Sequence, residues 1–242
     1  MASFGSYPQN VTFQTVNVSA GGGNENLLIN PRGKINQANE PDGVLSAGQY
    51  FCDGWKAGAA GAEVYIDPDG FRLISGSIVQ LVPNNLEVGR SVRANMDIIS
   101  GAPVISINSG GDNVLSDNAE YIQFEVSGNN SKFTRLILAE SVNLPIYQQE
   151  IDELKPCKRF LRKSLASGES WGNGAGSVLK VTVSYDEMHK VPAATKLSEV
   201  ATVNCTSAAA DVSKTGLAHR LVSSSSGSFW SNSVTYLLDA RP

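Results

Sequence analysis

Short apolar runs that alternate with polar residues, separated by turn residues, recur along most of this chain and constrain its fold more than any other feature. The sharpest case is the pair Ala62–Ile66 and Phe71–Ile74, which flanks the turn sequence Asp67-Pro68-Asp69-Gly70. Proline fixes φ in such a turn and glycine accepts a positive φ, so this segment predicts a β-hairpin. Further runs are Leu27–Asn30, Ser77–Val82, Ser91–Ile99, Pro103–Ile107, Tyr121–Val126 and Lys132–Ala139. Strands at this spacing without helical periodicity predict a sandwich or barrel.

The chain divides into three predicted parts, and together they give an all-β fold. Residues 1–26 are polar and contain a run of three glycines, so we expect an N-terminal arm with one strand at Val11–Val18. Residues 27–143 are predicted to form a jelly-roll-like β-sandwich. Residues 144–242 are predicted to form a smaller β-rich domain with one short helix in Gln148–Leu165, which Pro156 interrupts before a strand through Arg159–Leu165. Its other predicted strands are Leu179–Tyr185, Ala201–Cys205, Leu217–Val222 and Val234–Leu238.

Charge and hydropathy exclude two classes of partner. The net charge is −4, and residues 1–140 carry 8 basic and 14 acidic groups, so the pattern of a nucleic-acid-binding protein is missing. No apolar stretch is long enough to span a membrane. The first residues lack the basic and apolar regions of a secretory signal. We therefore expect no nucleic-acid partner, no membrane insertion and no signal peptide.

The cysteines and acids give no clear metal site. Cys52, Cys157 and Cys205 are widely spaced and are expected to be buried free thiols. We predict no cofactor and no bound metal. Calcium is the open alternative, because hard cations favour clustered carboxylate and amide oxygens. The residues that could supply them are Asp67, Asp69, Asp112, Asn113 and Asp117.

Catalytic motifs are weak in this chain. Gly168–Gly172 matches the G-x-S-x-G pattern around Ser170, and Asp186 with His189 or His219 follows in hydrolase order. That motif needs a helix after the serine, whereas Asn-Gly-Ala-Gly-Ser follows here. A glycosidase would need two carboxylates about 5–10 Å apart, and sequence cannot pair the acids at 112, 117, 120 and 125. We therefore predict that the protein is not an enzyme.

Aromatic residues in polar segments are the best binding candidates. Trp171 lies in a predicted glycine-rich loop, Ser167–Ser177, and Trp230 lies in a second polar loop rich in glycine and serine, so no strand period would bury either ring. Aromatic faces bind the apolar faces of sugars, and amides bind the hydroxyls, so Asn173 and Asn232 complete a candidate glycan site. Subunit contacts are the competing role for both tryptophans. Tyr50, Phe51 and Trp55 are expected in the core instead. A basic run, Lys155, Lys158, Arg159, Arg162 and Lys163, is either a solvated face or a contact for phosphate or lipopolysaccharide.

Several blocks in order resemble one protein family. Asn26–Trp55 contains N-L-L-I-N, a polar run ending in Ile-Asn-Gln, then G-Q-Y and D-G-W. Glu153–Phe160 reads E-L-K-P-C-K-R-F, and Met188–Thr195 reads M-H-K-V-P-A-A-T. Ser77–Val82, Leu86–Ala94 and Tyr236–Ala240 add further matches. Together they resemble bacteriophage tail-fibre and related virion proteins, whose sandwich resembles a carbohydrate-binding module. Gly54, where the family usually has arginine, departs from the pattern.

The resemblance implies a virion component, assembled in the cytoplasm of a bacterial host, commonly as a homotrimer with other virion proteins as partners. The leading hypothesis is a tail-fibre-type structural protein that presents a tip to a host-surface polysaccharide. The alternatives are a purely structural particle component, such as a capsid decoration or a tail or baseplate adaptor, and a polysaccharide hydrolase. The resemblance supplies no catalytic residues and no sugar contacts, so the tryptophan and asparagine candidates depend on the residues alone.

Overall fold

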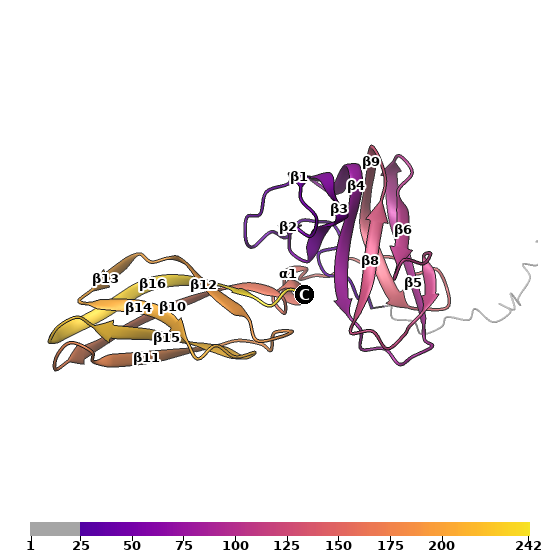
Figure 1. The fold of residues 1–242 in the computed structure, drawn as a ribbon. Helices are drawn as coiled ribbons and strands as arrows, with labels where there is room; N and C mark the ends of the chain where they lie inside the picture. Colours follow the sequence, from indigo (N-terminus) through magenta and orange to yellow (C-terminus); the bar gives the residue numbers. More distant parts are fainter. Residues whose placement is uncertain (1–24) are drawn as a thin grey trace, which may run out of the picture.

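The computed structural model describes residues 25–242 and confirms the all-β, sandwich-like class (Figure 1). The described residues contain sixteen strands and one four-residue helix. The strand expected at Val11–Val18 lies outside the described residues. The strands fall into two groups along the chain, and Figure 1 shows that the second group extends away from the first as an elongated body.

The first group is a nine-stranded antiparallel sheet that curves around one core. Its hydrogen-bonded path runs β1-β3-β4-β9-β5-β7, while β2 pairs with β3 and β8 pairs with both β4 and β6. The strands are β1 (Gly43–Leu45), β2 (Tyr50–Cys52), β3 (Trp55–Asp67), β4 (Gly70–Pro83), β5 (Ser91–Ser100), β6 (Val104–Ile107), β7 (Asn113–Leu115), β8 (Tyr121–Ser127) and β9 (Ser131–Glu140).

The predicted hairpin of β3 and β4 is present, and along its other edge β4 pairs with two different strands. Asp67 pairs with Gly70, which leaves Pro68 and Asp69 as the turn between β3 and β4. The first part of β4 then pairs with β9, and the part from Ser77 pairs with β8. Between these parts lies Gly76 at φ +84°, where a Cβ would stand 2.4 Å from the main-chain oxygen of Gly61. A residue with a side chain does not fit there, so glycine permits the strand to change partners.

Aromatic rings fill the core of this sheet. Trp55 is completely buried, as the sequence predicted, and its ring meets Phe71 at 5.2 Å and Phe124 at 5.9 Å between centroids. Its indole N–H donates a 2.9 Å hydrogen bond to the main-chain oxygen of Asn30. Phe51 is buried beside Phe71. The indole therefore joins the segment before β1 to strands β3, β4 and β8.

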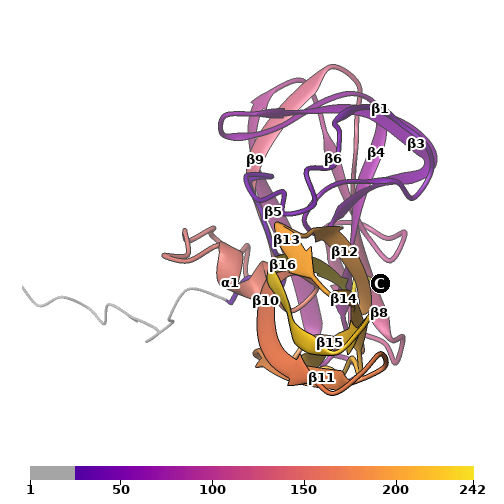
Figure 2. The same cartoon turned by 90° about the vertical axis from the view of Figure 1, so that its left-hand side faces the viewer.

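The second group is a two-layer sandwich. One layer has the order β10-β16-β12, with β13 also on β16, and the other has the order β11-β15-β14. The elements are α1 (Leu154–Cys157), β10 (Leu161–Gly172), β11 (Val178–Ser184), β12 (Ala193–Ser198), β13 (Ala201–Val203), β14 (Cys205–Ala210), β15 (Gly216–Ser223) and β16 (Gly227–Asp239). Figure 2 looks along this sandwich and shows the curvature of β10 and β11.

The short helix predicted within Gln148–Leu165 is present at Leu154–Cys157, and Pro156 lies inside its single turn, where proline is accepted. Three other predictions need correction. The strand expected at Arg159–Leu165 begins at Leu161 and runs to Gly172. Leu27–Asn30 forms no strand, although the Leu27 N–H donates to the main-chain oxygen of Leu138. Cys205 is half-buried and not fully buried, because it starts an edge strand; Cys52 and Cys157 are buried, and all three thiols are free.

The two groups of strands meet at a polar junction around Arg241. Its guanidinium pairs with Glu40 at 2.7 Å and with Asp239 at 2.7 Å, and it lies 4.0 Å from the centroid of the Tyr50 ring. The Tyr50 hydroxyl donates to the main-chain oxygen of Pro242 at 2.7 Å. Figure 1 shows the chain end at this place between the two bodies. A buried guanidinium with several charged and aromatic partners is held in one orientation. The contacts of Arg241 therefore fix the two groups of strands to each other.

Further contacts extend the junction. Asp53 is fully buried and accepts hydrogen bonds from the main-chain and side-chain nitrogens of Gln37, at 2.7 and 2.6 Å. Gln37 also donates to the main-chain oxygen of Leu161 at the start of β10. On the other side, the Tyr121 hydroxyl and the Nε2 atom of His189 lie 2.8 Å apart.

We predict that Trp55→Ala destabilises the protein by about 3–5 kcal/mol, because it leaves a cavity and removes the hydrogen bond to Asn30. Denaturant unfolding of the full chain measures this loss. The control is Val44→Ala, since Val44 is 82% exposed. A loss for Trp55→Ala as small as that of the control would show that the aromatic cluster does not carry the core.

Asp53 predicts a pH dependence of stability. Burial raises the pKa of its carboxyl above the usual value, and the hydrogen bonds from Gln37 only partly offset this. A raised pKa in the folded state means that lowering the pH from 7 towards about 4 favours folding through this group. The wild type should therefore gain stability relative to Asp53→Asn over this range, measured by denaturant unfolding at each pH. A wild type that loses stability relative to this variant as the pH falls would contradict the assignment.

Candidate functional site

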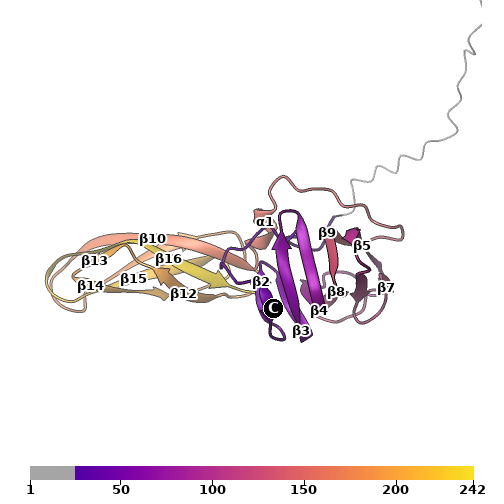
Figure 3. The ribbon, with the colours of Figure 1, turned by 90° about the horizontal axis from the view of Figure 1, so that it is seen from above.

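The end of the second sandwich that lies farthest from the junction is the candidate site. It is formed by residues 167–178, 200–207 and 222–233, which we call the distal end. These residues include the last part of β10, the first part of β16, strand β13 and the turns between neighbouring strands. Figure 3 shows this end from above, at the opposite extreme from the nine-stranded sheet.

Both predicted tryptophans are at the distal end, but on strands and not in loops. Trp171 belongs to β10 and is 72% exposed; Trp230 belongs to β16 and is half-buried. The expectation of a glycine-rich loop at Ser167–Ser177 is therefore wrong for its first half. Asn173 is exposed in the turn that follows β10, and Asn232 is exposed on β16.

The glycines that suggested a loop have a packing role. A Cβ on Gly168 would lie 2.9 Å from a methyl group of Val181 and 3.2 Å from one of Leu179, both on β11 in the opposite layer. A Cβ on Gly172 would lie 3.1 Å from the Ser177 side chain. Small residues let the two layers approach closely here, so this segment can be a strand despite its composition.

The register of β10 and β16 places three of the four candidates on one outward face. Glu169 pairs with Trp230, and Trp171 pairs with Ser228. Directly paired residues and residues two apart share a face of a sheet, so both indoles, Glu169, Ser228 and Asn232 point outward together. The two indoles are diagonal neighbours across the strands. On the other side of β16, Val203 of β13 pairs with Trp230 and is 44% exposed.

The inward face of β16 fixes the position of this surface. His219 of β15 is fully buried; its Nε2 lies 2.7 Å from the Ser231 hydroxyl and its Nδ1 lies 2.9 Å from the Tyr236 hydroxyl. Burial lowers the pKa of His219 and raises that of Tyr236 to about 12, which favours the neutral forms of both. This satisfied buried network holds the two layers in register behind Trp230.

The distal turns are tied to one another by hydrogen bonds. The Ser223 hydroxyl donates to the main-chain oxygen of Gly174 at 2.7 Å, and the Gly176 N–H donates to that of Ser223 at 2.8 Å. Asn204, between β13 and β14, accepts a 2.6 Å hydrogen bond from the Ser225 hydroxyl. The polar turns next to Asn173 therefore form a connected rim around the tryptophan face.

The distal end is almost uncharged. Across residues 167–178, 200–207 and 222–233, Glu169 is the one charged residue. Glu199, which directly precedes residues 200–207 in the sequence, forms an ion pair with Lys196 at 3.1 Å. A surface of hydroxyls, amides and two indoles can bind a ligand through hydrogen bonds and ring contacts without matching a charge. Sequence reasoning missed Glu169, Ser228 and Val203, because only the strand register shows that they share a face with the tryptophans.

The other sequence candidates do not form a site at this end. Ser170 lies within β10 on the inward face opposite Phe229, and a turn follows the strand where a helix would be needed. Asp67 and Asp69 are held in ion pairs with Lys132 and Arg32 among others. Among residues 25–242, no group of three or more His, Cys, Asp or Glu side chains could hold a metal ion.

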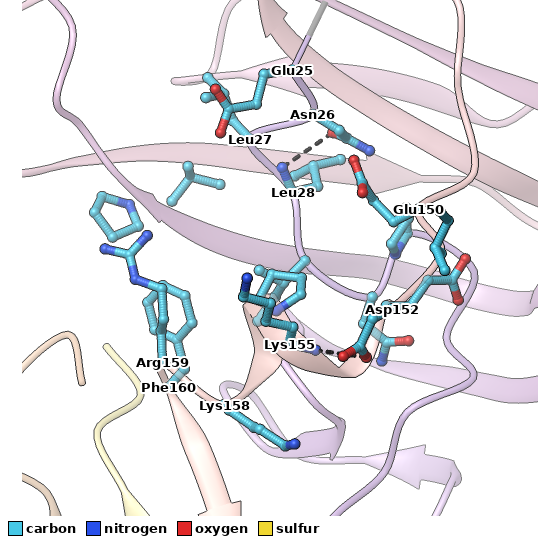
Figure 4. Close-up of a pocket in the computed structure, with 18 of the residues that line it drawn as sticks. Glu25, Asn26, Leu27, Leu28, Glu150, Asp152, Lys155, Lys158, Arg159 and Phe160 are labelled. Atoms are coloured by element: carbon cyan, nitrogen blue, oxygen red, sulfur yellow. Dashed lines mark hydrogen bonds between the residues drawn. The ribbon is translucent and has the colours of Figure 1, made fainter. Parts of the chain in front are cut away.

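A groove with a volume of about 680 Å³ lies beside the junction (Figure 4). Its floor includes the buried apolar residues Leu28, Ile29, Val82 and Phe160. Figure 4 shows Lys155, Lys158 and Arg159 on its α1 side and Glu25 and Glu150 across from them. The walls of this groove therefore carry charges of both signs.

Comparisons with family models, curated proteins and solved structures found no match for this chain. In the part of the chain that the structure describes, no helix is long and apolar enough to cross a membrane.

We predict that Trp171 supplies most of the quenchable tryptophan fluorescence of the native protein. Of the three tryptophans, Trp55 is fully buried and Trp230 is half-buried, so an aqueous quencher such as acrylamide should reach Trp171 most easily. Trp171→Phe should remove most of the quenchable fluorescence, while Trp55→Phe should keep it. A Trp171→Phe protein that is quenched as strongly as the wild type would place Trp171 in a contact with another subunit.

Proposed function

We propose that this chain is a bacteriophage virion structural protein of tail-fibre type, whose distal end binds a host-surface polysaccharide. The observation that carries the proposal is the nearly uncharged distal face with its two outward indoles. Two indoles that are neighbours on an otherwise polar surface are typical of a surface that contacts a partner. Polar turns around the indoles offer donors and acceptors suited to sugar hydroxyls.

The arrangement of the two bodies supports the same proposal. The junction around Arg241 joins the sandwich of β10–β16 firmly to the nine-stranded sheet, and the tryptophan face lies at the far end from that junction. A binding surface at the end of an elongated body is well placed to reach a cell surface. In this proposal the protein acts in the virion, assembles in the host cytoplasm, and binds without catalysing a reaction.

Binding at a single face of this size should be weak, about millimolar to micromolar, and gains strength when several copies bind together. A homotrimer, in contact with other virion proteins, would supply this multivalency. The proposal therefore includes an oligomer of the chain, and particle attachment elsewhere on the molecule.

A purely structural role, as a capsid decoration or a tail or baseplate adaptor, is the second candidate. One observation favours it: exposed apolar side chains continue among polar ones along the outward face of β10 and β16 towards the junction. Leu165 is 60% exposed and pairs with Thr235, next to the half-buried Leu237. Exposed apolar residues close together on a sheet face are typical of contacts between subunits.

Two substitutions on this one face separate the candidates. In the saccharide-binding account, Trp171→Ala abolishes binding to a glycan array or to host cells and leaves the oligomeric state unchanged, whereas Leu165→Ala keeps both. Light scattering gives the oligomeric state. If Trp171→Ala and Leu165→Ala both dissociate the oligomer, and the wild type binds no glycan, the face is a subunit contact and the structural role replaces the proposal.

A further inference from the structure

Glu169 is the single charge on a face made otherwise of indoles, hydroxyls and amides. It is exposed, and its side chain accepts one weak 3.4 Å hydrogen bond, from the Ser228 hydroxyl. Among the described residues, no basic group lies within ion-pair distance of it. Its carboxylate is thus free to accept hydrogen bonds from a ligand.

The position of Glu169 is as informative as its charge. It lies two residues from Trp171 on β10 and directly opposite Trp230 on β16, so its side chain leaves the sheet between the two indoles. The carboxylate is therefore the charged group nearest in register to both rings, and a saccharide that covers both of them lies over it. Within the distal end as the structure describes it, no basic side chain offsets this negative charge.

We propose that the distal end selects saccharides without acidic groups, and that Glu169 determines this specificity. The inference rests on the proposed function, because it assigns the class of sugar to the same face. A carboxylate only accepts hydrogen bonds, and it takes them strongly from neighbouring sugar hydroxyls and more strongly from a sugar ammonium group. It repels the carboxylates, sulfates and phosphates of acidic polysaccharides over about 8 Å at physiological salt.

The same reasoning sets an order among ligands. Neutral sugars gain ring contacts and charge-assisted hydrogen bonds, and amino sugars gain an ion pair in addition. Acidic sugars keep the ring contacts but meet an unpaired like charge. Affinity should therefore fall from amino sugars to neutral sugars to acidic sugars, and the discrimination against acidic sugars should weaken as salt is raised, because salt screens exposed charges.

The test uses the full chain on an array that holds neutral, amino and acidic oligosaccharides, at low and high salt. The wild type should bind neutral and amino glycans and leave acidic glycans unoccupied. Glu169→Gln keeps the size and one acceptor oxygen but removes the charge, so it should lose amino-sugar binding about tenfold and admit acidic glycans. Glu169→Lys should reverse the preference. Glu199→Gln is the matched control, because Glu199 lies near the face but is paired with Lys196.

The outcomes distinguish a failure of the role of Glu169 from a failure of saccharide binding itself. If Trp171→Ala abolishes glycan binding but Glu169→Gln leaves the array profile unchanged, the face binds sugars and the role of Glu169 is refuted. Strong wild-type binding to acidic glycans refutes it as well. If the wild type binds no glycan, or if Trp171→Ala leaves its glycan binding unchanged, the proposed function itself fails. This inference then fails with it.

Discussion

The long antiparallel pairing between β10 and β16 is the constraint on which the rest of the C-terminal sandwich depends. It begins at the junction, where Leu161 pairs with Asp239, and ends at the distal turns, where Gly172 pairs with Gly227. At its base, Asp239 holds Arg241 against Glu40 of the first body. At its far end the same two strands present the tryptophans. One hydrogen-bonded ladder therefore links the joint between the bodies to the candidate site, and the register of that ladder decides which side chains share the outward face.

Sequence reasoning predicted the strands that local turn residues and alternating hydrophobicity determine. It failed where a strand depends on packing against distant segments. The hairpin at Asp67–Gly70 and the alternating run Tyr121–Val126 appear nearly as predicted, because turn chemistry and alternation act within a few residues. The segment Ser167–Gly172 was expected to be a loop because of its glycines. Its strand state depends on pairing with β16 and on close contact with β11, which no local pattern reveals. Short edge strands such as Gly43–Leu45 were missed for the same reason.

The residues of the candidate site likewise include some that the sequence predicted and others that only the strand pairing reveals. Composition predicted Trp171 and Trp230 as exposed aromatics and Asn173 and Asn232 as their polar neighbours, yet it gave the wrong reason, since both indoles stand on strands. That Glu169 lies opposite Trp230 follows only from pairing between residues about sixty positions apart. The inward partner of this face, His219 with Ser231 and Tyr236, was likewise hidden in the sequence, where His219 was considered only as a catalytic candidate. Burial and hydrogen bonding assign it to the core.

The central claim is that the outward indoles of the distal end contact a saccharide, and the tryptophan side-chain N–H signals test it most directly. The chain has three tryptophans, so a nitrogen-15 correlation spectrum contains three indole signals, which substitution to phenylalanine assigns. Trp55 is an internal control, because it is buried and bonded to Asn30. On titration with an oligosaccharide that the protein binds on an array, the account predicts that the Trp171 and Trp230 signals shift and that of Trp55 stays fixed. Binding that leaves the Trp171 and Trp230 signals unmoved would contradict it.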